Sequence, residues 1–425
     1  MIWIMALLPL VLLALSLPIF IVLLLTSMVL IPWFMDVPVD VIPQMVFGSL
    51  DKYTLLAVPF FIFAGEIMGR GGISRRIVAW INSIVGGVRG GVAYTTVGAA
   101  EFFGALSGSS TATVVAIGKL MYPALEEQGY QRRFSLGLLT SSGAIASIIP
   151  PSIMMILFGA SAEVSVASLF IAGIIPGLLV GVCLALYVLW HTWNKESGVR
   201  MPFDGRRFLR ASLDSAWALG TPLIILGGIY MGIFSPTEAA GVACVYGVVV
   251  SKYIYREVTW KEVWEVTMSS LYLSSQLLII VAASGIFSWI LTISGVPQML
   301  VDAIRQLSSD PWTVMIIINV FLLIVGCFVD PVSAIVILTP LLAPLAELLG
   351  FDPIHFGIIM CVNLSIGMFT PPFGLNIFAS QSLFKVPVTE IYRGLVPFIV
   401  ASVGALAAIV YFPSLSLWLV GIMAQ

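Results

Sequence analysis

Two pairs of helix-breaking stretches inside strongly apolar sequence constrain the fold of this chain more than any other feature. The first pair is residues 107–111 (SGSST) and 150–152 (PPS), and the second is residues 326–331 (GCFVDP) and 370–374 (TPPFG). A broken helix inside a membrane leaves backbone N–H and C=O groups unpaired, which is tolerated only where the break is buried in protein or lines a site. The paired breaks therefore predict functional sites within a bilayer.

The composition agrees with a membrane location. Of the 425 residues, 60% are hydrophobic and 9% are charged, whereas about 25% are charged in a typical soluble protein. We therefore expect an all-α polytopic protein in a lipid bilayer. We expect no nucleic-acid partner, because such proteins carry a clustered basic face. Residues 1–34 lack a basic n-region, which favours a retained membrane helix over a signal peptide.

Apolar runs and basic segments predict the topology. Continuous runs predict spans at residues 1–34, which Pro9 and Pro18 could kink, and at 55–69, 168–193, 217–234, 239–255, 271–293 and 394–419. Residues 70–91 and 297–310 are expected to form amphipathic helices, and residues 256–265 a charged link. The positive-inside rule puts the basic segments 70–89 and 195–210 in the cytoplasm. Runs 92–125 and 315–349 then form re-entrant hairpins that open to opposite sides, and runs 134–159 and 356–383 form broken helices.

The two hairpin regions are copies of each other. A constant offset of 221 residues, the difference between Pro123 and Pro344, also superposes the Pro-Pro pairs 150–151 and 371–372. The same offset pairs Glu126 with Glu347, Gly129 with Gly350, Ile156 with Ile377, Ser161 with Ser382, Gly173 with Gly394 and Pro176 with Pro397. Because the predicted topology turns one copy over, the copies form an inverted repeat, which is typical of secondary transporters with sites near the midplane.

The first pair of breaks is rich in oxygen and has no thiol. Gly108 lets the backbone turn, and Pro150 and Pro151 free the carbonyls one turn earlier. Such a set of ligands suits a hard cation such as Na+. Close packing of small residues is the alternative, and for any single serine it is the better interpretation. The side-chain oxygens belong to Ser107, Ser109, Ser110 and Thr111.

The second pair of breaks contains a carboxylate. Asp330 lies inside an apolar run, where an ionisable side chain is a candidate for function by default, either as a cation ligand or as a proton carrier. Asp330 could equally cap the next helix, and both roles can hold together. Thr370 and the carbonyls before Pro371 and Pro372 would complete the oxygens. Asn376 could reach a polar substrate, and Glu101 is a weaker candidate. Helix N-termini at the tips favour an anionic substrate.

The sequence resembles one transporter family over nearly its whole length. The motifs that carry the resemblance are residues 56–65 (LAVPFFIFAG), 102–110 (FFGALSGSS), 149–153 (IPPSI), 169–177 (LFIAGIIPG) and 370–374 (TPPFG). Together they resemble the large membrane subunit of the tripartite ATP-independent periplasmic (TRAP) transporters. The resemblance implies Na+-coupled uptake of a small organic acid anion, such as sialic acid or a C4-dicarboxylate, across a bacterial inner membrane. It also implies a small four-helix membrane subunit and a periplasmic substrate-binding protein as partners.

The resemblance further implies an elevator mechanism and assigns the candidate residues. One sodium site would use Ser107, Gly108, Ser109, Ser110, Thr111, Ile149 and Pro150. The other would use Gly326, Asp330, Gly367, Thr370 and Pro371. The substrate would meet Pro151, Ser152, Pro372, Gly374 and Asn376. The implied transport domain comprises residues 92–165 and 311–385, and the scaffold comprises residues 1–91, 166–310 and 386–425.

Three other functions fit parts of the sequence less well. An intramembrane enzyme would need a paired-aspartate, HExxH or Ser/His constellation in the spans, and none is evident, so we expect no enzymatic activity. An anion channel would conduct without stoichiometric coupling to a cation. A proton-coupled transporter of the same fold would use Asp330 as the proton carrier, and oxygen ligands alone do not separate it from a Na+-coupled one.

Overall fold

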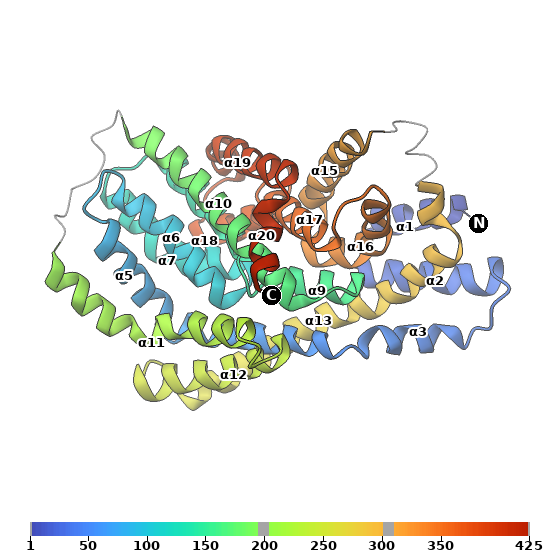
Figure 1. Cartoon of the computed structure of the whole chain (residues 1–425), viewed down its shortest axis with the longest axis horizontal. Helices are drawn as coiled ribbons and strands as arrows, with labels where there is room; N and C mark the ends of the chain where they lie inside the picture. The colour runs from blue at the N-terminus through green and yellow to red at the C-terminus, as the bar shows by residue number, and fades with distance from the viewer. Residues whose placement is uncertain (1, 194–203, 301–309, 424–425) are drawn as a thin grey trace.

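The computed structural model describes residues 2–193, 204–300 and 310–423, and every regular element in these ranges is helical (Figure 1). The first half contains α1 (Ile2–Ala14), α2 (Ile19–Phe34), α3 (Val41–Leu50), η1 (Tyr53–Leu56), α4 (Ala57–Arg70), α5 (Ile73–Val85), α6 (Gly91–Ser107), α7 (Ser110–Glu127), α8 (Arg132–Ala144), η2 (Ile145–Ser147), α9 (Ile153–Ala162) and α10 (Val166–Trp193). The second half contains α11 (Gly205–Tyr230), α12 (Pro236–Val249), η3 (Val250–Ile254), α13 (Trp260–Ile293), α15 (Pro311–Phe328), α16 (Pro331–Leu348), α17 (Pro353–Gly367), α18 (Leu375–Phe384), α19 (Val388–Tyr411) and α20 (Ser414–Met423).

The repeat predicted from the sequence is present in the helix boundaries. Helices α7 and α16 begin and end at positions that differ by the offset of 221 residues. The pairs α6/α15, α8/α17 and α9/α18 begin within one residue of that offset. Gly129 and Gly350, which follow α7 and α16, both have a left-handed φ, of 76° and 85°. Both Pro-Pro peptide bonds are cis. The matching Pro and Gly positions thus give two copies of one hairpin followed by one broken helix.

The two copies meet at equivalent residues. Ser147 and Met368 differ by 221 positions, and the Ser147 hydroxyl lies 3.8 Å from the Met368 sulfur. If a rotation relates the two copies, equivalent residues can touch only where they lie close to the rotation axis. The end of the first broken helix therefore lies against the end of the second, and the two breaks converge as the sequence predicts.

Several predicted spans have different limits in the structure. The run at residues 1–34 forms two helices, because the chain breaks at Ser16, whose φ is 61°, and restarts after Pro18; Pro9 stays within α1. Helix α13 begins at Trp260 after a Thr259–Glu262 capping box, so residues 260–265 of the expected charged link are helical. The last run is interrupted between α19 and α20. Residues 301–309 of the expected helix at 297–310 and residues 195–203 of the expected basic loop lie outside the described residues, and residues 205–210 are part of α11 rather than of a loop.

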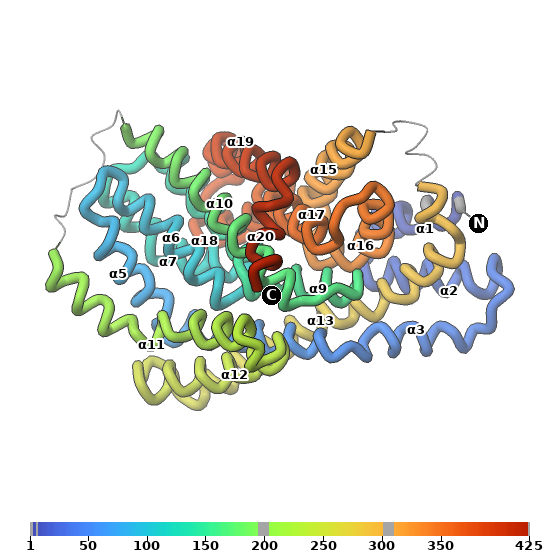
Figure 2. Tube along the Cα trace, in the orientation of Figure 1, coloured from blue at the N-terminus to red at the C-terminus, as the bar shows by residue number. Residues whose placement is uncertain are grey.

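Helices α2, α3, α11, α12 and α13 form one long edge of the molecule, and the two hairpin copies lie on one side of it (Figures 1 and 2). Helix α13 packs along α2, α3, α4 and α16, so it joins this edge to the second hairpin. Helix α5, predicted as amphipathic, buries Ile73, Ile77 and Ile81 and packs on α6 and α11.

Seven of the described helical segments are long and apolar enough to cross a membrane. They are Tyr53–Arg70, Val166–Trp193, Gly205–Tyr230, Trp260–Ile293, Pro311–Phe328, Pro331–Leu348 and Val388–Tyr411. Helices α15 and α16 have 18 residues each, which corresponds to about 27 Å at the α-helical rise. This is slightly less than the roughly 30 Å of the hydrocarbon core.

Candidate ion and substrate site

The first hairpin turns at Gly108 and restarts at Ser110. Gly108 has a φ of 57°, and a Cβ there would lie 2.6 Å from the carbonyl oxygen of Pro151. Only glycine therefore fits both the left-handed turn and the close approach to the first Pro-Pro break. Ser109 caps α7 by accepting a hydrogen bond from the Ala112 N–H. The tip of the first hairpin is thereby held directly on the first broken helix.

Oxygen atoms cluster at this tip. The Ser107 hydroxyl lies 3.1 Å from the Thr113 hydroxyl. Thr113 donates to the carbonyl of Ser109 at 2.9 Å, and the Ser109 and Thr111 hydroxyls are 3.5 Å apart. Ser107 and Thr113 are buried. The structure thus brings four hydroxyls and a backbone carbonyl together without a charged group among them, which is chemistry that suits Na+.

The second hairpin approaches its broken helix through two glycines. A Cβ on Gly367 would lie 2.5 Å from the backbone of Gly326, so α15 and α17 are in backbone contact there. The N–H of Gly374 donates to the carbonyl of Cys327 at 3.1 Å, and the Phe328 and Phe373 rings are 5.4 Å apart. The predicted residues Gly326, Gly367 and Gly374 therefore lie at one junction.

Asp330 caps α16 at this junction. Its carboxylate accepts a hydrogen bond of 2.9 Å from the Ser333 N–H, so the capping role considered from the sequence is present. The Ser333 hydroxyl is fully buried and has no hydrogen-bond partner among the described residues. Thr370 donates to the carbonyl of Ile366 at 2.7 Å. A buried hydroxyl without a partner, on the helix that the carboxylate caps, makes Ser333 and Asp330 candidate cation ligands.

Asn376 connects the two copies. Its amide nitrogen lies 2.7 Å and its amide oxygen 2.9 Å from the Ser110 hydroxyl, and the nitrogen also donates to the carbonyl of Thr140 at 3.2 Å. Ser110 is the first residue of α7, and Asn376 is the second residue of α18. The N-termini of these two helices, one from each copy, therefore meet at a buried polar contact.

The other predicted substrate residues differ in their surroundings. Ser152 is fully buried and donates to the carbonyl of Ser147 at 2.5 Å. Pro372 is exposed, and its carbonyl accepts a hydrogen bond from the Tyr392 hydroxyl. Pro151 faces Gly108, as described above. The polar side chains of Ser152 and Asn376 thus already have protein partners.

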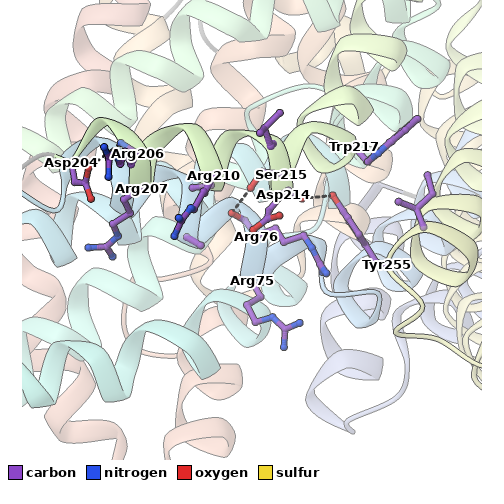
Figure 3. A pocket seen from close by; sticks show the side chains of 14 residues that line it. Arg75, Arg76, Asp204, Arg206, Arg207, Arg210, Asp214, Ser215, Trp217 and Tyr255 are labelled. Atoms are coloured by element: carbon purple, nitrogen blue, oxygen red, sulfur yellow. Dashed lines mark hydrogen bonds between the residues drawn. The ribbon is translucent and has the colours of Figure 1, made fainter.

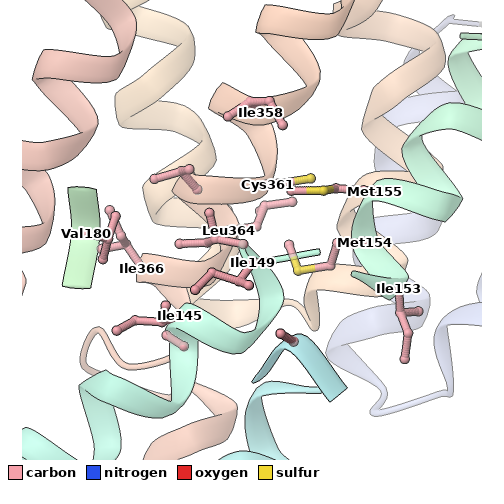
Figure 4. Packing of buried hydrophobic residues seen from close by; sticks show 14 of the residues in the cluster. Ile145, Ile149, Ile153, Met154, Met155, Val180, Ile358, Cys361, Leu364 and Ile366 are labelled. Carbon is pink, nitrogen blue, oxygen red and sulfur yellow. The ribbon is translucent and has the colours of Figure 1, made fainter. Parts of the chain in front are cut away.

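Buried apolar side chains pack around both Pro-Pro breaks. Figure 4 shows Ile145, Ile149 and Met154 of the first broken helix facing Leu364 and Ile366 of α17. These five side chains belong to one buried cluster. This buried apolar packing lies against the breaks, so the polar groups there are the hydroxyls, carbonyls and the Asp330 carboxylate described above.

The family model for "Tripartite ATP-independent periplasmic transporter, DctM component" matches residues 6–415. The chain belongs to this family. It is therefore the large permease subunit of a TRAP transporter and a multi-pass membrane protein, and its relatives are permeases rather than enzymes.

Curated relatives of this TRAP permease span several substrates. It is 39% identical to the C4-dicarboxylate TRAP transporter large permease protein DctM of Pseudomonas aeruginosa, over 87% of each chain. It is 37% identical to the 2,3-diketo-L-gulonate TRAP transporter large permease protein YiaN of Escherichia coli, over 95% of each chain. It is also 38% identical to the isethionate TRAP transporter permease protein DctMQ of Oleidesulfovibrio alaskensis, over 91% of this chain but only 61% of that protein.

A solved structure has the same fold. The Alcanivorax borkumensis YdaH transporter superposes with a TM-score of 0.64 over 94% of this chain and 97% of that chain, at 14% sequence identity. At that identity the likeness concerns the fold alone. The TRAP permease therefore shares its helical architecture with a transporter whose structure is known.

Two residues of the candidate site, Thr113 and Ser333, were not identified from the sequence, and Glu101, the weaker candidate, is directed elsewhere. Thr113 and Ser333 lie on the first turns of α7 and α16. Each follows the N-cap of its helix, Ser109 or Asp330, by one helical turn, and this spacing could have identified them from the sequence. Glu101 faces Gly181 of α10: a Cβ on that glycine would overlap the Glu101 carboxylate at 1.5 Å. Glu101 is therefore directed toward α10.

Proposed function

We propose that this TRAP permease couples the inward movement of Na+ to uptake of a small organic acid anion across the bacterial inner membrane. It would act with a small four-helix membrane subunit and a periplasmic substrate-binding protein that delivers the substrate. The names of the relatives favour a C4-dicarboxylate over sialic acid as the first substrate to test.

The observation that carries the proposal is the meeting of helix N-termini from both copies. The N-termini of α7 and α18 join through Ser110 and Asn376. The tip at Gly108 also approaches Pro151, two residues before α9 begins. Helix N-termini carry partial positive charge and unpaired N–H groups, which favour a bound anion. This supports an organic acid substrate even though no arginine is near the breaks in the sequence.

Two groups of oxygen atoms support Na+ as the coupling ion. At the first site the proposed ligands are the hydroxyls of Ser107, Ser109 and Thr113 with backbone carbonyls, among them that of Pro151. At the second site they are the Asp330 carboxylate, the Ser333 hydroxyl, which no described residue hydrogen bonds, and carbonyls beside Gly367 and Thr370. Bound Na+ would place positive charge beside an anionic substrate, so each would raise the affinity of the other.

We further propose an elevator movement in which the hairpins and broken helices move as one body. The family resemblance put α10 and α19 in the scaffold. Close backbone contacts at their glycines favour including both helices in the moving body instead. A Cβ on Gly173 of α10 would lie 2.9 Å from the carbonyl of Ile148, and one on Gly394 of α19 would lie 2.1 Å from that of Arg133. Backbones in such close contact are expected to move together.

Uptake into proteoliposomes tests the function. The permease would be reconstituted with its small subunit and binding protein, and radiolabelled C4-dicarboxylate, sialic acid and isethionate would be compared. We expect uptake of one acid to require an inward Na+ gradient and to saturate. Uptake driven by a proton gradient alone would make Asp330 the proton carrier, and uptake that neither saturates nor depends on a cation gradient would indicate a channel.

A further inference from the structure

A basic groove lies between the amphipathic helix α5 and the N-terminal half of α11, apart from the helix breaks. It has a volume of about 980 Å³. Figure 3 shows Arg207 and Arg210 extending from α11 on the side where Arg75 and Arg76 of α5 lie. With Arg206, five arginines line the groove, against two aspartates, Asp204 and Asp214. The groove therefore carries an excess of positive charge.

Some of these arginines already form ion pairs within the protein, and others do not. Arg75 and Arg76 both donate to the carboxylate of Glu257 at 2.6 Å, and the Arg76 guanidinium lies 3.6 Å from the centre of the Tyr255 ring. Arg206 and Arg210, by contrast, are exposed and form no ion pair with any described residue. They stand four residues apart on one helix face, where like charges repel unless an anion lies between them.

The other end of the groove is apolar and aromatic. Leu213 and Trp217 continue the face of Arg206 and Arg210 along α11, and their side chains are 67% and 50% exposed. Ile254 and Tyr255 complete this end. A change from arginine to tryptophan along one helix face is typical of the level at which a helix passes from lipid headgroups into the acyl region. A free phosphate ion would need only the arginine end.

We propose that this groove binds an anionic phospholipid, with the phosphate held by Arg206 and Arg210 and an acyl chain lying along Leu213 and Trp217. Guanidinium groups bind phosphate through paired N–H donors, and basic pockets between helices on the cytoplasmic side of a membrane are suited to anionic headgroups. The bound lipid would lie along the N-terminal half of α11, beside α5, at the cytoplasmic surface. This inference concerns the scaffold side and is independent of Na+ coupling and of substrate.

Lipid titration of the purified full chain in detergent, followed by native mass spectrometry, tests the proposal. The probes are phosphatidylglycerol, phosphatidylcholine with the same acyl chains, and inorganic phosphate. The double variant Arg206→Gln/Arg210→Gln is compared with Arg89→Gln/Lys261→Gln, which removes two exposed positive charges elsewhere. Thermal unfolding without lipid checks that both variants are folded.

We expect the wild type and the control variant to bind one phosphatidylglycerol saturably, and the groove variant to bind it about tenfold more weakly. Phosphatidylcholine and inorganic phosphate should neither occupy nor compete for this site. Equal binding of phosphatidylglycerol by the groove variant would overturn the proposal. Equal binding of phosphatidylcholine would show an apolar slot, and displacement by inorganic phosphate would show a site for the free anion, and both results would contradict a lipid site.

Discussion

The side chains of Ser110 and Asn376 are hydrogen bonded to each other, although 266 residues separate them in the sequence. The contact is buried, and it joins the first turn of the first hairpin's second helix to the helix that follows the second Pro-Pro break. A polar contact inside an apolar core fixes one relative position of the two copies. Ion and substrate sites formed on both sides of it would therefore be coupled through it.

Asn376→Ala should impair both stability and coupling. It leaves the Ser110 hydroxyl and the Thr140 carbonyl without this partner, which should cost about 1–3 kcal/mol of unfolding free energy. The matched control is Asn319→Ala, which removes the partner of Asn363 at 2.6 Å between α15 and α17, two helical turns before Gly326. Thermal unfolding should show similar losses, whereas Na+-dependent uptake should fall only in Asn376→Ala. Equal uptake by the two variants would make the Ser110–Asn376 contact purely structural.

Gly367→Ala should separate the second hairpin from its broken helix. The added methyl would meet the backbone of Gly326 at 2.5 Å, and backbone cannot move aside as a flexible side chain can. Overpacking of this kind costs about 1–3 kcal/mol, so the unfolding temperature should fall. In Gly404→Ala, the control on α19, nothing lies within 4 Å of the new methyl, and the unfolding temperature should stay the same or rise. An unchanged unfolding temperature in Gly367→Ala would refute the close contact.

Ser333→Ala should show whether the Ser333 hydroxyl binds Na+ or only occupies space in the core. The hydroxyl is buried and has no partner in the part of the chain that the structure describes, so its removal should not destabilise the protein when Na+ is absent. If the oxygen is a Na+ ligand, the rise in unfolding temperature produced by NaCl over choline chloride should become smaller. Ser402→Ala removes another orphaned hydroxyl on α19 and should keep the full Na+ response. An undiminished response in Ser333→Ala would exclude this oxygen from the site.

Asp330→Asn should separate charge from helix capping. Asparagine caps a helix about as well as aspartate, whereas alanine loses about 1 kcal/mol. If Asp330 only caps α16, Asp330→Asn should transport like the wild type. If its charge binds the ion, Asp330→Asn and Asp330→Ala should both lose Na+-stimulated uptake. Asp352→Asn, which changes the cap of α17, should remain active in either case.

The repeat could be predicted from the sequence because Pro and Gly act locally. Each sets the backbone at its own position, so Gly129 with Gly350 and the two Pro-Pro pairs give the same turns in both copies. In the run at residues 1–34, Pro18 indicated a possible kink, but the left-handed turn at Ser16 had no signal of its own, and the expected single span was wrong. Asn376 was predicted to reach the substrate. Its hydrogen bond to Ser110 could not be predicted, because a contact across 266 residues depends on how the two copies pack.

The most direct test of the central claim is Na+ binding to the purified permease, measured with radiolabelled Na+ at saturating concentration. Two sites at the paired breaks predict two Na+ per chain in the wild type. Asp330→Ala and Ser107→Ala should each retain about one, because the two sites are formed by different copies. Binding of two Na+ by both variants would contradict the account, and the paired breaks would then serve only to pack the helices.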